Sequence, residues 1–489
     1  MIKRKADKAE TTEEMRKQVM DWKTLLCQDR IRMVPYRREA SGNDLRTEFE
    51  KDYHRIIGSA SFRRLQDKTQ VFPLDQSDFI RTRLTHSLEV SSFCKSLGQN
   101  VSQKIIKLGL DEQFGEPEKA AVCDILQCAG LIHDIGNPPF GHFGETAIQD
   151  WFRKNLPLMR YEGRQLTEIL TRQMQEDFYH FEGNTQALRL VTKLHYLVDE
   201  HGMNLTKALL GTIIKYPVSS LGINRESGNI REKKMGYFYA DREAFEEIQQ
   251  SNGTHGCRHP LAFLLEAADD IAYKTADIED AMKKGCLSYA KLVEELKECL
   301  KDGPPQCVQM IDWLEKRYEK AIRIQYEKPE TYAVQNWVIS VQGQMIACAT
   351  EGFVEHYQAI MEGSYEKDLF EGTFGKAMMD ALGDIAYRYA FCSKPIIKLE
   401  LGADAIFDFL LGKFTDAVLC FDTDHQMSAV QKKMVSLISD NHMRIYRICS
   451  DQKSEAEKLY LRLLLVTDYI SGMTDSFAKR LYQELNGIV

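Results

Sequence analysis

The sequence LIHDIG at residues 131–136 carries an apolar helix into a turn and places His133 and Asp134 at the junction. A neutral imidazole and the adjacent carboxylate can bind one divalent ion where a helix loses its regular repeat of about 3.6 residues. Gly136 and the NPP at residues 137–139 supply such an irregularity. An isolated His-Asp pair is most often a helix cap or a surface pair, so a metal site requires further ligands elsewhere in the chain.

Two other apolar helical segments supply those ligands. His86 lies upstream in RTRLTHSLEV, and Asp269 lies downstream in LAFLLEAADDIAY. With His133 and Asp134 they form a set of two nitrogens and two oxygens. This set suits Mn²⁺, Mg²⁺ or Fe²⁺ with open positions better than a closed structural zinc site. Each residue alone is typical of a satisfied core histidine or a capping aspartate, but the set of four favours a metal site.

Composition limits the classes of protein that the chain can represent. Its 489 residues allow two to four domains, and its net charge of -8 disfavours bulk attraction to nucleic acid or to an acidic membrane, although local basic pockets remain open. The N-terminal MIKRKADKAETTEEMRK has no apolar signal core, and no apolar run is long enough to span a membrane. The twelve cysteines include no CxxC pair. We therefore expect a cytoplasmic protein with reduced, buried cysteines and no membrane partner.

Apolar residues recur at three- and four-residue spacing through most of the chain, whereas strand-like alternation is scarce. The pattern predicts an all-α, predominantly helical fold. The predicted helices are 86–108, 119–132, 184–198, 261–283 and 288–300. The predicted irregular stretches are the tail to about Glu14, 222–236 and 250–258. The predicted regions are an N-terminal tail and helix (1–34), a catalytic core (35–303) and a helical C-terminal region (304–489), which begins at a proline pair and packs on the core.

Seven motifs, in this order along the chain, resemble the deoxyguanosinetriphosphate triphosphohydrolase family, the bacterial dGTPases of the HD-domain superfamily. The similarity is collinear from about Arg38 to Tyr482. It implies an HD-domain phosphohydrolase core with a helical C-terminal extension, and hydrolysis of dGTP, and of other dNTPs, to the deoxynucleoside and inorganic triphosphate. The motifs are FRRLQDKTQVFPL, RTRLTHSLEV, LIHDIGNPPFGHFGE, HFEGNTQALR, KYP, RHPLAFLLEAADDIAYKTADIEDA and VTDYISGMTDSFA.

The resemblance also selects between two neighbouring aspartates. In the family, the metal-binding aspartate is followed by tyrosine four residues on and by aspartate eight residues on. This spacing selects Asp269, with Tyr273 and Asp277, over Asp270. Because residues four apart share a helical face, a ligand at the metal could touch all three, and Asp270 would point elsewhere, toward a neighbouring helix.

His142 and Glu145 are three residues apart in the loop that follows the ligand pair. At this spacing the carboxylate can orient the imidazole and raise its basicity. The resemblance implies that the pair acts at the α-phosphate, where a metal-activated water attacks and His142 protonates or positions the departing 5′ oxygen. Whether His142 is an acid, a base or a nucleophile stays open at this point.

A triphosphate requires cations in addition to one metal ion. Arg83 precedes His86 by three residues and shares its helical face, and it resembles the phosphate-contacting arginine of the family. Lys215 and Tyr216 in KYP resemble a second contact to phosphate and sugar. Lys233 and Lys234 are further candidates. Most lysines and arginines are solvated surface charges, so only their position relative to the ligands favours a function.

The sugar pocket is also assigned by resemblance. Tyr273, Asp277 and Gln70 match family positions where an aromatic ring excludes a 2′-hydroxyl and polar groups pair with the 3′-hydroxyl. Glu182 and Asn184 resemble residues near the substrate. His180 replaces an arginine that is frequent in that motif. No residue that reads guanine can be chosen, so the preference for dGTP depends on the resemblance.

Two alternatives remain for the function. One is an HD phosphohydrolase that acts on nucleoside monophosphates or a cyclic dinucleotide. The other is a catalytically silent nucleotide sensor or a single-stranded nucleic acid binder. The resemblance further implies a homo-oligomer with a single-stranded DNA or nucleotide effector. The C-terminal VTDYISGMTDSFA is mostly apolar, which predicts packing in the core or between subunits.

Overall fold

Helices form most of the chain in the computed structural model, which describes residues 19–32, 44–74, 77, 79–196 and 199–488. The predicted all-α class is confirmed, since the only sheet in this part of the chain is a hairpin of two-residue strands, β1 (Arg160–Tyr161) and β2 (Arg164–Gln165). The predicted tail to about Glu14 lies outside the described residues. No helix in the described ranges is both long and apolar enough to cross a lipid bilayer.

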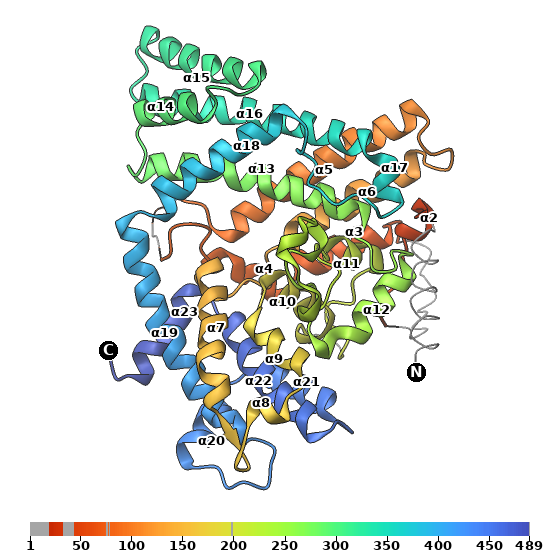
Figure 1. Ribbon diagram of the computed structural model, residues 1–489, viewed down its shortest axis with the longest axis vertical. Helices are drawn as coiled ribbons and strands as arrows, with labels where there is room; N and C mark the ends of the chain where they lie inside the picture. The colour runs from red at the N-terminus through yellow and green to blue at the C-terminus, as the bar shows by residue number, and fades with distance from the viewer. Residues whose placement is uncertain (1–18, 33–43, 75–76, 78, 197–198, 489) are drawn as a thin grey trace.

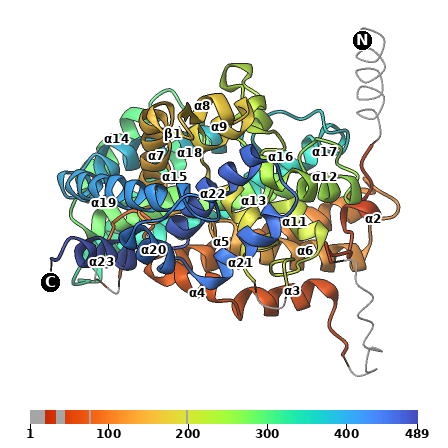
Figure 2. The same ribbon diagram turned by 90° about the horizontal axis from the view of Figure 1, so that it is seen from below.

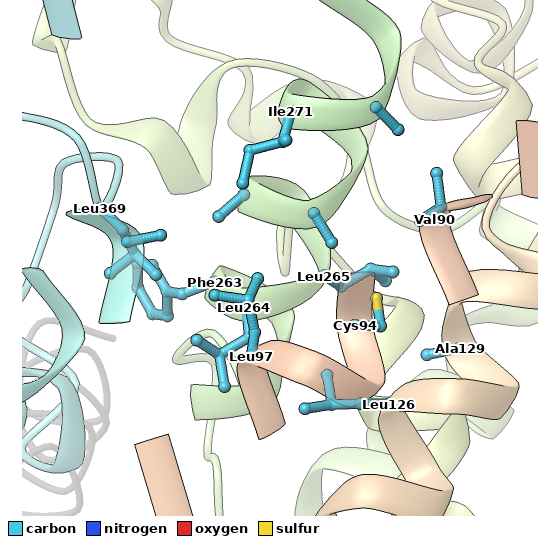
Figure 3. Packing of buried hydrophobic residues seen from close by; sticks show 14 of the residues in the cluster. Val90, Cys94, Leu97, Leu126, Ala129, Phe263, Leu264, Leu265, Ile271 and Leu369 are labelled. Carbon is cyan, nitrogen blue, oxygen red and sulfur yellow. The ribbon is translucent and has the colours of Figure 1, made fainter. Parts of the chain in front are cut away.

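Three long helices carry the metal-ligand candidates: α5 (Arg83–Leu108), α6 (Glu116–Ile132) and α13 (Pro260–Lys283). Local sequence sets where they begin. Thr82 caps α5 by accepting from Thr85 N, and prolines occupy the first turns of α6 and α13, where no backbone donor is needed. The three helices pack against one another. Figure 3 shows their apolar side chains interlocking, with Leu97 of α5, Leu126 of α6 and Leu264 of α13 among them.

The packing of α5 on α6 depends on a glycine beside the ligand motif. A Cβ at Gly130 would lie 2.5 Å from Ser91 Cα, so only a hydrogen at this position lets the two backbones approach this closely. Ser91 Oγ also donates to Gln127 O at 2.8 Å. The close approach brings His86, on α5, next to His133, which directly follows α6.

The other helices surround these three (Figures 1 and 2). Those that precede α13 are α2 (Trp22–Leu25), α3 (Glu48–Ile57), α4 (Ala60–Arg64), α7 (Gly141–Asn155), α8 (Leu166–Ile169), α9 (Arg172–Tyr179), α10 (Gly183–Arg189), α11 (Lys207–Ile213) and α12 (Arg242–Ser251). Those that follow are α14 (Tyr289–Cys299), α15 (Pro305–Arg323), α16 (Pro329–Glu355), α17 (Tyr357–Met361), α18 (Phe374–Ala386), α19 (Lys394–Leu419), α20 (Ala429–Ser436), α21 (Asp440–Ser450), α22 (Glu455–Ser471) and α23 (Asp475–Leu485).

Short 3-10 turns link several helices: η1 (Leu65–Asp67), η2 (Leu156–Leu158), η4 (Ser220–Gly222), η5 (Arg225–Ser227), η6 (Ile230–Glu232) and η7 (Tyr239–Asp241). Two further segments are π-helical: η3 (Leu190–Leu194) and η8 (Tyr387–Phe391). The predicted helix at 184–198 was therefore too long. It is α helix only to Arg189, and it leaves the helical conformation at His195, after the wider turn of η3.

Two apolar clusters form the interior. The first joins α5, α6 and α13 to α16 and α18, and it continues without a break past residue 304. The second joins α7 and α9 to α19 and α22. In Figure 1, α5, α13, α16 and α18 lie in the upper part of the view, and α7, α9 and α22 lie in the lower part. The predicted regional boundaries at residues 34 and 303 stay predictions. All twelve cysteines are free, as expected, although only six are buried and two are exposed.

Candidate metal centre and active site

Three helices bring the four predicted ligands together. Asp269 Oδ1, from α13, lies 3.3 Å from both His86 Nε2 and His133 Nε2. Asp134 Oδ2 lies 3.6 Å from His133 Nε2, and the candidate ligand atoms of His86, His133 and Asp134 all lie within 4.8 Å of one another. Donor atoms that share one divalent ion, each bound at about 2.1 Å, are typically about 3 to 4 Å apart. The spacing of His86, His133 and Asp134 therefore fits one divalent ion, and Asp269 Oδ1 lies beside both imidazoles.

The position of the proton on the His133 ring also suits a metal ligand. Its Nδ1 lies 2.8 Å from Gly130 O, and since a carbonyl only accepts, Nδ1 carries the proton and donates. In the neutral ring Nε2 then holds a lone pair, and this buried atom makes no hydrogen bond within the described part of the chain. Fixing one imidazole nitrogen in this way is how proteins orient a metal-binding histidine.

Charges around the centre keep its carboxylates ionised. Burial alone would raise the pKa of Asp134, but the charge of Arg83 outweighs it and holds that pKa far below its usual range. Burial also opposes ionisation of Asp269, whose pKa is nevertheless held well below normal, chiefly by the charge of Lys215. Two ionised carboxylates beside two imidazoles form a site for a cation.

Asp270 does not face the centre. Its Oδ2 lies 3.5 Å from Lys274 Nζ, one turn further along α13, and burial raises its pKa to about 6. This ion-pair partner is on the same helix, and the expectation that Asp270 points toward a neighbouring helix stays a prediction. The preference for Asp269 over Asp270 agrees with this geometry.

His142 and Glu145 face each other in the first turn of α7. His142 Nδ1 lies 2.9 Å from Glu145 Oε2, and Glu145 Oε1 accepts from Gly183 N at 2.7 Å. The Glu145 side chain is 6% exposed and that of His142 is 67% exposed, so a fixed carboxylate holds an accessible imidazole. The charge of Glu145 and its hydrogen bond raise the pKa of His142 above the usual value. The His142 imidazole can therefore remain protonated near neutral pH.

The predicted cations lie at the centre, where they pair with its carboxylates. Arg83 donates to Asp134, and Lys215 Nζ lies 2.8 Å from Asp269 Oδ2. Both side chains are buried. Tyr216, next to Lys215, is buried as well, and burial raises its pKa to about 12, so its hydroxyl stays protonated.

Glu182, Asn184 and Lys234 form a second polar group, which adjoins the His142–Glu145 pair. Glu182 accepts from Asn184 Nδ2 at 2.7 Å and lies 2.7 Å from Lys234 Nζ. Lys234 also helps to lower the pKa of Glu145 against the effect of burial. His180, by contrast, pairs with Glu176 at 3.3 Å and belongs to neither group.

The predicted sugar-binding residues include buried polar groups that lack partners. Asp277 is fully buried, and neither of its carboxylate oxygens makes a hydrogen bond to any described residue. Burial raises the pKa of Asp277 far above normal. Gln70 Oε1 is also buried without a partner among these residues. Tyr273 stacks on Phe391 with ring centroids 6.1 Å apart. Unsatisfied buried groups of this kind are candidates for pairing with a ligand.

The sequence interpretation assigned no role to several groups at the site. Lys68 Nζ donates to Asn137 O at 2.5 Å, and Asn137 Nδ2 donates to Asp134 Oδ1 at 2.8 Å. Both residues lie inside motifs that had been recognised, so their position was a usable signal. Asp475 also lies inside a quoted motif, the C-terminal VTDYISGMTDSFA. Phe391 reaches the site from the π-helical turn η8, and no local pattern could have identified it.

Comparisons with known proteins agree with this arrangement. A family model described as the HD domain matches residues 83–208. The chain is 46% identical over 474 residues to a "Deoxyguanosinetriphosphate triphosphohydrolase-like protein" of Listeria monocytogenes, covering 96% of this chain and 100% of the relative. A protein of the same description from Pseudomonas aeruginosa is 34% identical, with 96% and 99% covered. A "Deoxyguanosinetriphosphate triphosphohydrolase" of Yersinia enterocolitica is 30% identical, with 92% and 96% covered.

Proposed function

The chain belongs to the deoxyguanosinetriphosphate triphosphohydrolase-like family of HD-domain phosphohydrolases, and on this premise we propose that it hydrolyses dGTP, and other dNTPs, to the deoxynucleoside and inorganic triphosphate. One observation carries the proposal: His86, His133, Asp134 and Asp269 converge, and Arg83, which pairs with Asp134, also approaches Gly141, the residue before His142. A cation site next to an oriented imidazole supplies the groups that hydrolysis of a phosphate ester needs.

The four converging side chains would hold one Mn²⁺, Mg²⁺ or Fe²⁺ ion. When bound, such an ion polarises phosphate oxygens and lowers the pKa of water. It would also release the buried cations. Asp134 and Asp269 now balance Arg83 and Lys215 charge for charge. A dication would neutralise the carboxylates and leave Arg83 and Lys215 free to stabilise a triphosphate.

His142 acts in this proposal as the general acid. Its raised pKa keeps the imidazole protonated to a higher pH than in an ordinary histidine, and its exposed side chain can reach a substrate. A water attacks the α-phosphorus and gives up a proton to solvent, the bond from phosphorus to the 5′ oxygen breaks with its electron pair on that oxygen, and His142 gives its proton to the same oxygen. Glu145 holds the imidazole and stabilises its charged form.

The remaining candidates bind the substrate. Lys234 and Tyr216 would add contacts to phosphate and sugar, with Glu182 and Asn184 ordering Lys234. Tyr273 would cover the sugar face that carries no 2′-hydroxyl. Asp277 and Gln70, which hold buried oxygens without partners, would pair with the 3′-hydroxyl: Gln70 Oε1 would accept its proton, and the Asp277 carboxyl, whose pKa is raised, would donate to its oxygen. By family resemblance, we extend the proposal to a cytoplasmic homo-oligomer with a single-stranded DNA or nucleotide effector.

Phosphorus NMR tests the reaction. Purified protein is incubated with Mn²⁺ and each dNTP in turn, with and without a chelator. Free triphosphate should form, fastest from dGTP and only with the metal. Pyrophosphate or orthophosphate as the product would point to an HD phosphohydrolase that cuts another bond. Absence of turnover across all dNTPs and effectors would point to a sensor.

His133→Ala tests the metal site directly. Removing Nε2 should abolish Mn²⁺ binding and turnover, while far-ultraviolet circular dichroism stays helical, because the three helices are held mainly by the first apolar cluster. Calorimetric titration with Mn²⁺ measures binding. His180→Ala, which removes an imidazole outside the site, is the matched control. Turnover by the His133 variant in metal-depleted buffer would contradict the proposed mechanism.

A further inference from the structure

The turn that leads into His142 has an unusual backbone. Phe140 and Gly141 both adopt the left-handed conformation, with φ of 59° and 62°. Glycine tolerates this region, but a bulky aromatic residue does so only when its surroundings enforce it. Phe140 is also the residue before α7, which has no side-chain cap at this end. The direction of His142, two residues on, therefore depends on whatever holds Phe140.

Two C-terminal helices hold it. Asp475, the first residue of α23, accepts from Phe140 N at 2.8 Å through Oδ1, and through Oδ2 it accepts from Thr69 N at 3.0 Å and from Thr69 Oγ1. Asp475 is 1% exposed. The Phe140 ring packs against Phe407 of α19, with centroids 6.2 Å apart. The carboxylate thus joins the turn before His142 to the segment that carries Gln70.

Lys68 forms a second connection. Its buried Nζ donates to Asn137 O at 2.5 Å and to Ser471 O, at the end of α22, at 2.7 Å. No carboxylate of the described chain pairs with it within ion-pair distance, and burial lowers its pKa to about 7. A buried amine held only by two carbonyls contributes little to stability. It does, however, fix Asn137, which donates to Asp134.

We infer that Asp475 and Lys68 are positioning residues, through which the C-terminal helices fix the turn 137–141 and so aim His142 and Asp134. The C-terminal motif, for which packing was predicted, then contributes to the active site as well as to the interior. The inference rests on the proposed function, which gives His142 its task. Neither residue touches substrate in this assignment.

Asp475→Asn is the main test, because the amide keeps the shape but offers one acceptor oxygen in place of two. Asp177→Asn is a matched control: Asp177 is also fully buried and accepts from one backbone amide, Tyr239 N at 2.7 Å, and from the hydroxyls of Ser220 and Tyr460, none of which belongs to the turn 137–141. Thr69→Val, which removes a single hydrogen bond to Asp475, serves if the Asn variant does not fold.

Two readouts separate positioning from stability. Asp475→Asn should lower kcat about 10- to 100-fold with little change in KM, the usual loss when a group that orients a catalytic site is removed. It should also speed amide hydrogen exchange in peptides covering 137–145. Asp177→Asn should leave both unchanged. Equal kcat and equal exchange in the two variants would overturn the inference. If wild-type protein turns over no dNTP, the proposed function fails, and the exchange readout alone decides the inference.

Discussion

At the scale of single residues, similar side chains at the site differ in charge and hydrogen bonding. Asp134 and Asp269 are only partly exposed yet ionised, because Arg83 and Lys215 lie within ion-pair distance. His133 donates from Nδ1 and leaves Nε2 unused. Asp277, by contrast, is buried with no cation bonded to it, and burial raises its pKa. The protonation of each group is therefore determined by its immediate neighbours and not by its residue type.

Tyr273→Ala tests sugar selection. The ring, which is stacked on Phe391, is the proposed barrier to a 2′-hydroxyl, so its removal should admit GTP. The ratio of kcat/KM for dGTP to that for GTP should fall by about tenfold or more. Tyr273→Phe, which keeps the ring, should retain the wild-type ratio. An unchanged ratio in the Ala variant would remove Tyr273 from this role.

Glu145→Gln tests the proton on His142. The carboxylate raises the pKa of His142, so the protonated acid persists to higher pH, and activity should be lost as pH rises through that raised value. Removing the charge should move this falling limb of the profile of kcat/KM against pH to lower pH. Glu176→Gln, in the separate pair with His180, is the matched control. A limb at the same pH in wild type and Glu145→Gln would argue against His142 as the acid.

At the scale of helices, the approach of α5 to α6 determines whether the two imidazoles meet. Their ring centroids are 5.3 Å apart, although His86 starts one helix and His133 ends the other. Gly130 permits this approach by placing no side chain against Ser91. The separation of α5 and α6 therefore determines how close His86 and His133 lie to each other.

Gly130→Ala tests this dependence. The added methyl group would meet the Ser91 backbone and push the helices apart, so it should destabilise the protein by about 1–3 kcal/mol and weaken Mn²⁺ binding. Gly343→Ala, within α16, is the control, since its Cβ would meet nothing within 4 Å and alanine should stabilise that helix by about 0.5–1 kcal/mol. Urea unfolding and Mn²⁺ titration measure both effects. Tight Mn²⁺ binding by Gly130→Ala would contradict the argument.

At the scale of the whole molecule, a buried ionic network joins the two apolar clusters. Arg189, at the end of α10, donates to Asp468 of α22 at 2.8 Å and to Asp241 at 3.1 Å. Gln186 adds a bond to Asp468, and Lys193 pairs with Asp241 at 2.9 Å. All the charges are thereby matched. The network fixes the C-terminal helices relative to the helices that carry the centre.

Arg189→Met tests the network. It would leave two buried carboxylates short of a partner and should lower the free energy of unfolding by about 3–5 kcal/mol. Arg153→Met removes an exposed pair with Asp150 and should cost less than about 1 kcal/mol. Urea unfolding of both variants measures the difference. A similar decrease in the free energy of unfolding in the two variants would show that the buried network does not hold the C-terminal helices.

The sequence by itself determined the helical class and was enough to choose the four candidate ligands. Helix periodicity and the contiguous motifs are local, so His86, His133, Asp134 and Asp269 could be selected before any distance was known. A spacing of three residues also predicted the His142–Glu145 pairing, although the pair was expected in a loop and lies in helix α7.

Only the tertiary structure decided what holds these residues in place. Asp475 meets Phe140 across 335 residues, and Lys68 meets Ser471 across 403. Phe391 reaches Tyr273 from the π-helical turn η8. Such contacts have no sequence period, since they arise where separately folded helices pack. Burial and charge pairing follow from the same packing, and they set which carboxylate is ionised and which imidazole nitrogen is free.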